Sequence, residues 1–235
     1  MALPLYLALT AAEFQICSSF PQRAAWMACH YSPYASGLSN MPQNLPPDSM
    51  LILNDRTPPC GHDAALIAEQ LKECVDFLQC SSVLLDFQRP DFEENAAVAK
   101  SVIANLTCPV GVSQLYAGGL DCPVFLPPVP LTVPVENCLS PWQNREIWLE
   151  AAQNRETITV TEQGTISRPA SFPDETEQAF FDKVLRCHYK SVPEAAQVRF
   201  TLWRTQDDLS QLLAEAETLG ATKAIGLWQE LDGCI

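Results

Sequence analysis

Short apolar runs of strand length recur along the 235-residue chain, and this repetition constrains the fold more than any other feature. Most of these runs are apolar on both faces, which is typical of parallel strands whose two sides are covered. The runs predict eight strands, at residues 5–10, 50–55, 82–87, 109–116, 123–128, 146–151, 198–204 and 224–230.

Amphipathic helical stretches separate several of these runs. Ile67, Leu71 and Val75 share one helical face, and the same period recurs in residues 99–106 and 209–219. Strands that alternate with helices indicate a parallel sheet, and eight such units close into a barrel. We therefore predict the α/β class and a (β/α)8 TIM barrel that forms a single domain over residues 1–235.

Two stretches depart from the alternation. Residues 30–49 are rich in Pro, Ser and Asn and predict a long loop after the first unit. Residues 157–168 alternate around Gly164 and predict a small β-hairpin insertion. Residues 25–33, "AWMACHYSP", could form an additional early strand, and the sequence pattern does not decide whether they do.

Charge and cysteine usage narrow the classes of partner and compartment. The net charge is -14 and no run is rich in Lys or Arg, so we expect no nucleic-acid partner and no membrane partner. A small-molecule or oligosaccharide ligand fits this charge better. The ten cysteines are scattered through apolar runs, which indicates reduced thiols and a cytoplasmic location.

The two ends of the chain carry weaker signals. The apolar start, "MALPLYLALTAAEF", lacks a basic segment before it, so no signal peptide is expected. The chain ends at Ile235, soon after the last predicted strand, and a face left without its helix would be covered by a second copy. A homodimer is therefore a further expectation.

Polar and aromatic residues gather where the predicted strands end. In a barrel of parallel strands these ends meet at one rim, and that rim carries the chemistry. We predict a cleft there with Asp86, Gln88 and Glu150 as the reacting groups. The predicted substrate-binding residues are Asp55, Arg56, Arg89, Gln114, Tyr116, Trp203, Arg204, Trp228 and Glu230.

The run "SSVLLDFQRPDFEEN" (81–95) resembles the fourth strand of family 18 glycoside hydrolases, the chitinase-like barrels. Their motif, DGxxxDxE, ends in the catalytic glutamate. Asp86 matches the last aspartate, and Gln88 stands at the place of the glutamate. The run "DDLSQLLAEAETLGATKAIGLWQELDG" (207–233) resembles the last helix and strand of the same family, with Trp228 at the place of the tryptophan below the sugar.

The resemblance implies a TIM barrel that acts on or binds amino sugars, in which the glutamate protonates the glycosidic oxygen. A glutamine has no titrating proton, so Gln88 predicts a carbohydrate-binding protein with weak or no hydrolase activity. Two alternatives stay open. One is an active glycosidase that uses Glu150 or Glu230 with Asp86, and the other is a barrel enzyme that binds a small anionic metabolite through arginines.

One difference from the family concerns the order of the strands. The predicted strands place the Asp86 run third, whereas the family carries its motif on the fourth; an extra strand at 25–33 would remove the difference.

No cofactor and no metal are expected. The chain has no phosphate-binding glycine loop, dinucleotide fingerprint or nucleophile elbow. Cys60 and His62 lie in a polar, glycine-containing segment, but no second pair at metal-ligand spacing accompanies them.

Overall fold

The apolar runs form a closed ring of parallel strands in the computed structural model, which describes residues 3–17, 20–59, 61–171 and 179–231. Around the ring the order is β1-β14-β8-β7-β6-β5-β4-β2, and β2 pairs with β1 to close it. The ring strands are β1 (Leu5–Leu9), β2 (Ala24–Tyr31), β4 (Met50–Asn54), β5 (Ser82–Asp86), β6 (Val110–Ser113), β7 (Val124–Leu126), β8 (Ile147–Ala151) and β14 (Ala221–Leu227). The fold is therefore the predicted (β/α)8 TIM barrel.

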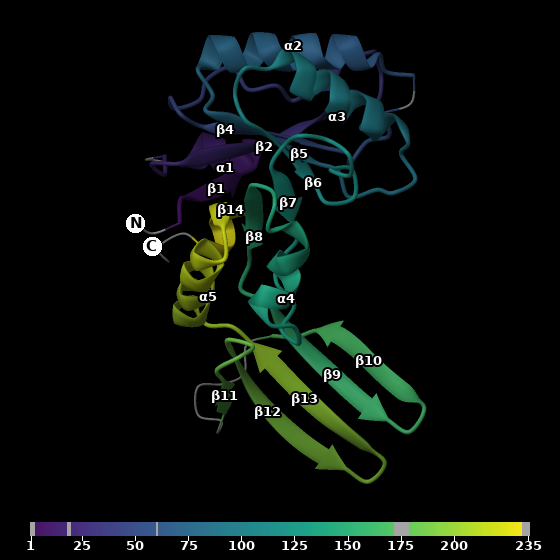
Figure 1. Ribbon diagram of the computed structural model, residues 1–235, viewed down its shortest axis with the longest axis vertical. Helices are drawn as coiled ribbons and strands as arrows, with labels where there is room; N and C mark the ends of the chain where they lie inside the picture. The colour runs from purple at the N-terminus through teal and green to yellow at the C-terminus, as the bar shows by residue number, and fades with distance from the viewer. Residues whose placement is uncertain (1–2, 18–19, 60, 172–178, 232–235) are drawn as a thin grey trace.

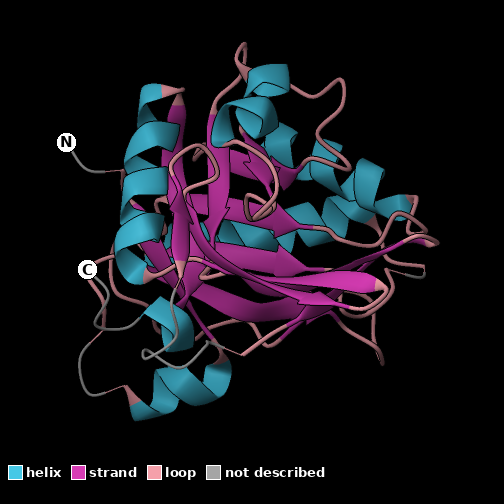
Figure 2. Ribbon diagram, turned by 90° about the horizontal axis from the view of Figure 1, so that it is seen from below, coloured by secondary structure: helices cyan, strands magenta, loops and turns pink. Residues whose placement is uncertain are grey.

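Helices lie around the strands (Figure 2). They are α1 (Ala11–Ile16), α2 (Ala64–Leu78), α3 (Glu94–Asn105), α4 (Val135–Leu139), α5 (Gln206–Thr218) and α6 (Trp228–Leu231), with a 3-10 turn at Ser140–Trp142. In the described ranges, no helix combines the length and the apolar character of a membrane span.

The capping residues explain where these helices begin. The Asp63 side chain accepts from the backbone N–H of Ala65 at the start of α2, and Thr205 forms a capping box with Asp208 at the start of α5. The predicted apolar faces of α2 and α5 are largely buried. On α3, Ala99 and Val102 are buried and Ile103 is partly exposed.

Side chains alternate along each strand, and this alternation divides the core in two. One set fills the ring: Tyr6, Ala8, Ala25, Met50, Ile52, Leu84, Phe125, Trp148 and Ile225. The other set packs against the helices and includes Leu53, Leu85 and Leu149. Trp148 is fully buried and lies over Gly111, where an added Cβ would be 2.3 Å from the ring. Gly111 is therefore required by the size of the indole.

One predicted barrel strand was wrong. Residues 198–204 form β13 (Gln197–Trp203), which pairs antiparallel with strands outside the ring. Its side chains are only partly buried over most of its length, unlike those of the ring strands. Residues 25–33 supply the missing strand as β2, so β5 is the fourth strand of the barrel and the order agrees with the family motif.

A second sheet is inserted between β8 and α5 and projects away from the barrel (Figure 1). Its order is β10-β9-β13-β12-β11, all antiparallel. The predicted hairpin is confirmed as β9 (Arg155–Thr161) and β10 (Gly164–Pro169), and it is joined by β11 (Phe180–Asp182), β12 (Cys187–Glu194) and β13. The sequence had indicated only the hairpin.

Arg204 ties this second sheet to the barrel. Its buried guanidinium donates to the backbone carbonyls of Val129 and Pro130 in the segment after β7, and to those of Leu185 and Arg186 before β12. The predicted long loop at 30–49 contains the end of β2 and the two-residue strand β3 (Leu38–Ser39), which pairs with β2 outside the ring.

Candidate functional site

The carboxyl ends of six ring strands surround a cavity of about 450 Å³. The lining residues lie on β1, β2, β4, β5, β8 and β14 or just beyond the ends of these strands. Phe125 of β7 completes the lining. The lining is apolar at its base, where Ile52, Leu84 and Ile225 lie. Its polar residues are Thr10, His30, Asn40, Asn54, Arg56, Asp86 and Glu150.

Asp86 reaches the cavity because of strand parity. On β5 the side chains of Ser82, Leu84 and Asp86 share the face toward the barrel axis, whereas Val83 and Leu85 pack against the helices. The Gln88 amide donates a hydrogen bond to Asp86 Oδ1. The pKa of Asp86 is raised, mainly by burial and also by the Asp55 carboxylate. The hydrogen bond from Gln88 offsets part of this rise in the pKa.

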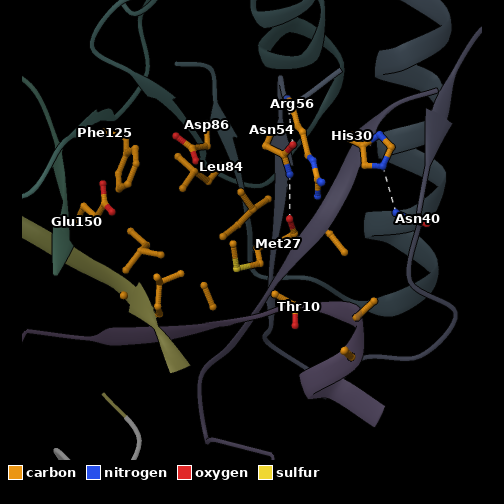
Figure 3. A pocket seen from close by; sticks show the side chains of 18 residues that line it. Thr10, Met27, His30, Asn40, Asn54, Arg56, Leu84, Asp86, Phe125 and Glu150 are labelled. Carbon is orange, nitrogen blue, oxygen red and sulfur yellow. Dashed lines mark hydrogen bonds between the residues drawn. The ribbon is translucent and has the colours of Figure 1, made fainter. Parts of the chain in front are cut away.

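Glu150 enters the same cavity from β8. It lies near Phe125, and Asp86 is on the same side of the cavity (Figure 3). Burial, followed by the Asp86 and Glu230 carboxylates, raises the pKa of Glu150 to about 7. Near neutral pH a large share of this side chain is therefore protonated and able to donate a hydrogen bond or a proton.

The other end of the cavity carries amides, an imidazole and a cation (Figure 3). The Asn54 amide donates to the Met27 carbonyl (2.9 Å), and the Arg56 backbone N–H donates to Asn54 Oδ1 (3.2 Å). His30 Nε2 lies 3.1 Å from the Asn40 amide nitrogen, and His30 Nδ1 lies 2.7 Å from the Tyr31 carbonyl. A carbonyl only accepts and an amide N–H₂ only donates, so in this arrangement His30 Nδ1 donates to Tyr31 and Nε2 accepts from Asn40.

Asp55 points to the opposite side of its strand from Asn54. Its carboxylate is buried and accepts from the backbone N–H groups of Gln88 (3.0 Å) and Arg89 (2.9 Å). It also accepts from the Asn95 amide at 3.0 Å. Asp55 therefore holds the segment after β5, including Gln88, and does not line the cavity.

The remaining predicted site residues lie in four other places. Arg89 is exposed and pairs with Asp91 (3.5 Å), while the Tyr116 hydroxyl donates to the Arg89 carbonyl. Gln114 is exposed at the end of β6. Trp203 stacks on His188 at the base of the second sheet, where Arg204 also lies. Trp228 begins α6, and Glu230 is exposed on the same helix.

Of the predicted residues, Arg56, Asp86 and Glu150 line the cavity, and Gln88 contacts it through Asp86. His30, Asn40 and Asn54 were not predicted. Parity along the strand at 50–55 could have indicated Asn54, because it shares a face with Met50 and Ile52. His30 could have been predicted as a site residue only if residues 25–33 had been assigned to a barrel strand.

The described residues include no group of three or more His, Cys, Asp or Glu side chains that could hold a metal ion. Cys60, from the polar segment noted in the sequence, lies outside the described residues. His62 Nε2 contacts the Ala35 carbonyl (3.1 Å). The thiols of Cys29, Cys74, Cys80, Cys108, Cys122, Cys138 and Cys187 are free.

Comparison with solved structures shows that the fold of this chain is similar to that of several chitinases and other glycosidases. A family 18 N-acetylglucosaminidase from Paenibacillus barengoltzii superposes with a TM-score of 0.63 and 9% identity, over 99% of this chain and 96% of that one. A chitinase from Chromobacterium violaceum gives 0.56 and 9%, over the same shares of the two chains.

The spore cortex-lytic enzyme SleL of Bacillus cereus gives a TM-score of 0.55 at 9% identity, over 95% of this chain and 70% of its own. At such identities the likeness establishes the fold. No protein-family model and no curated protein matches the sequence.

Proposed function

We propose that this barrel binds an amino-sugar glycan in the cavity at the carboxyl ends of its strands and hydrolyses it weakly or not at all. The observation that carries the proposal is the amide of Gln88 on the carboxylate of Asp86. This pair stands on the fourth strand of the barrel, where the family motif places its aspartate and its catalytic glutamate.

The chemistry of an amide separates binding from hydrolysis. Gln88 donates and accepts hydrogen bonds and so still suits a sugar hydroxyl, but it cannot protonate the leaving oxygen. The cavity volume of about 450 Å³ lies in the range of small-ligand sites, and its apolar base and polar walls suit a sugar ring.

The test compares the native protein with Gln88→Glu. We expect binding of N-acetylglucosamine oligomers by calorimetry and background turnover of a fluorogenic oligomer by the native protein. Gln88→Glu should raise turnover, with general acid catalysis worth about 10²- to 10⁴-fold. Gln163→Glu adds the same charge in the β9–β10 turn, outside the cavity, and should change nothing. Robust native turnover that survives Asp86→Asn would overturn the proposal.

A second candidate function has its own supporting observation. Glu150 lines the same cavity as Asp86, and its pKa of about 7 suits a general acid. On this alternative the native protein hydrolyses the oligomer, Glu150→Gln abolishes turnover, and the pH profile falls above about 7. Background turnover by the native protein from pH 4 to 8 would rule it out.

A further inference from the structure

The cavity has opposite charges at its two ends. Asp86 and Glu150 lie at the end beside Phe125, and Arg56 lies at the end beside His30 (Figure 3). Both ring nitrogens of His30 are already in contact with protein groups, Nδ1 with the Tyr31 carbonyl and Nε2 with the Asn40 amide. Among the described residues that line the cavity, Arg56 is the only arginine, and the lining has no lysine.

Arg56 is placed to meet a ligand. Its side chain is exposed, and within the described ranges its guanidinium forms no ion pair and no hydrogen bond. The acid next to it in sequence, Asp55, is on the far side of the strand and is bound to the Gln88 and Arg89 N–H groups. The backbone of Arg56 is held by Asn54, which is itself bound to the Met27 carbonyl, so the guanidinium extends from a fixed point.

From these positions we infer that the ligand is an amino sugar that carries a carboxylate, and that Arg56 binds this carboxylate. The inference rests on the proposed function and specifies the class of sugar. A guanidinium pairs with a carboxylate through two parallel hydrogen bonds, which is the geometry that Arg offers and Lys does not.

Charge also determines the number of acidic groups and the orientation of the ligand. The chain carries a net charge of -14, which disfavours a polyanion at long range, so a single carboxylate close to Arg56 is favoured. At the other end of the cavity, the Asp86 carboxylate repels an acid, and Asp86 and Glu150 both suit hydroxyl and amide groups. The ligand therefore lies with its acidic substituent toward Arg56 and its neutral sugar ring toward Phe125.

The test uses two sugars that differ only in charge: a disaccharide of N-acetylglucosamine and N-acetylmuramic acid, and its carboxamide. Calorimetry on the native protein should show tighter binding of the acid, by about tenfold or more for a charge-assisted pair. Arg56→Gln should remove this preference, so that the two sugars bind with similar affinity, and Arg56→Lys should keep part of the preference.

Arg23→Gln is the matched control, because Arg23 is exposed at the amino end of β2, on the opposite rim of the barrel. It should leave both affinities unchanged. Circular dichroism of each variant checks that the barrel is folded.

The outcomes separate the two proposals. Equal binding of both sugars, unaffected by Arg56→Gln, would overturn the role of Arg56 and leave the amino-sugar function standing. Lactate supplies the same carboxylate without a sugar. Arg56-dependent binding of lactate without binding of either sugar would overturn the proposed function and this inference together, in favour of a small anionic metabolite. Failure of all three probes to bind would also overturn both.

Discussion

Replacing Glu150 by glutamine should stabilise the protein above neutral pH and leave it unchanged in acid. The pKa of Glu150 is raised from 4.5 to about 7, so the folded state holds this proton over a pH range where the unfolded chain has lost it. Each pH unit between the two values is worth about 1.4 kcal/mol, so the full penalty on the ionised folded state is about 3 kcal/mol. Glu150 is partly exposed, and solvent screening reduces this to about 1–2 kcal/mol.

The sign follows from the direction of the shift. Below 4.5 both states are protonated and the penalty is absent; it grows as pH rises toward 7 and is complete above that. Thermal unfolding at pH 4, 6 and 8 should therefore show equal midpoints at pH 4. At pH 8 the Glu150→Gln midpoint should be higher by about 2–8 °C for a protein of this size.

The control for this experiment is Glu73→Gln, on the exposed face of α2, which should show no such pH-dependent gain. If Glu150→Gln is instead less stable than the native protein at pH 8 and equal to it at pH 4, the ionised carboxylate makes favourable contacts, and the reasoning from burial and like charge fails.

Two further substitutions test the packing. Gly111→Ala should destabilise the barrel by about 1–3 kcal/mol in urea unfolding, because the new methyl group would clash with the Trp148 ring. Gly118→Ala is the control, because there is open space around Gly118. Equal stability of the two variants would contradict this account of the barrel interior. Arg204→Met should cost about 3 kcal/mol or more and speed hydrogen exchange in the second sheet, because four backbone carbonyls lose their donor. The control is Arg199→Met, at an exposed position of β13, the strand that ends just before Arg204. If exchange in Arg204→Met stays as slow as in this control, the Arg204 anchor is wrong.

The fold was largely predictable, and the error has a physical cause. Alternation of apolar strands and amphipathic helices reports which faces are buried, and that information was enough for the barrel and for the hairpin at 157–168. It does not report which strand pairs with which. Residues 198–204 were apolar enough to resemble a ring strand, yet their partners are β9 and β12, and β2 occupies the place in the ring.

The candidate site was predictable only in part. Asp86 and Glu150 were predicted at strand ends and do line the cavity, since strand parity sends them inward. By the same rule Asp55 faces outward, next to Asn54, which faces in. Trp203 and Arg204 were predicted at the end of a barrel strand, but that strand is β13 of the second sheet. Both residues therefore lie at the base of the second sheet.

The sequence by itself determined the repeating βα units and the glutamine at position 88, because periodicity and residue identity are local properties of the chain. Only the tertiary structure decided that Glu150 would lie in one cavity with Asp86 and thereby have its pKa raised. It also decided that Arg56 would be the cation at the far end of that cavity. These properties depend on distances between residues far apart in the chain, and closure of the ring sets those distances.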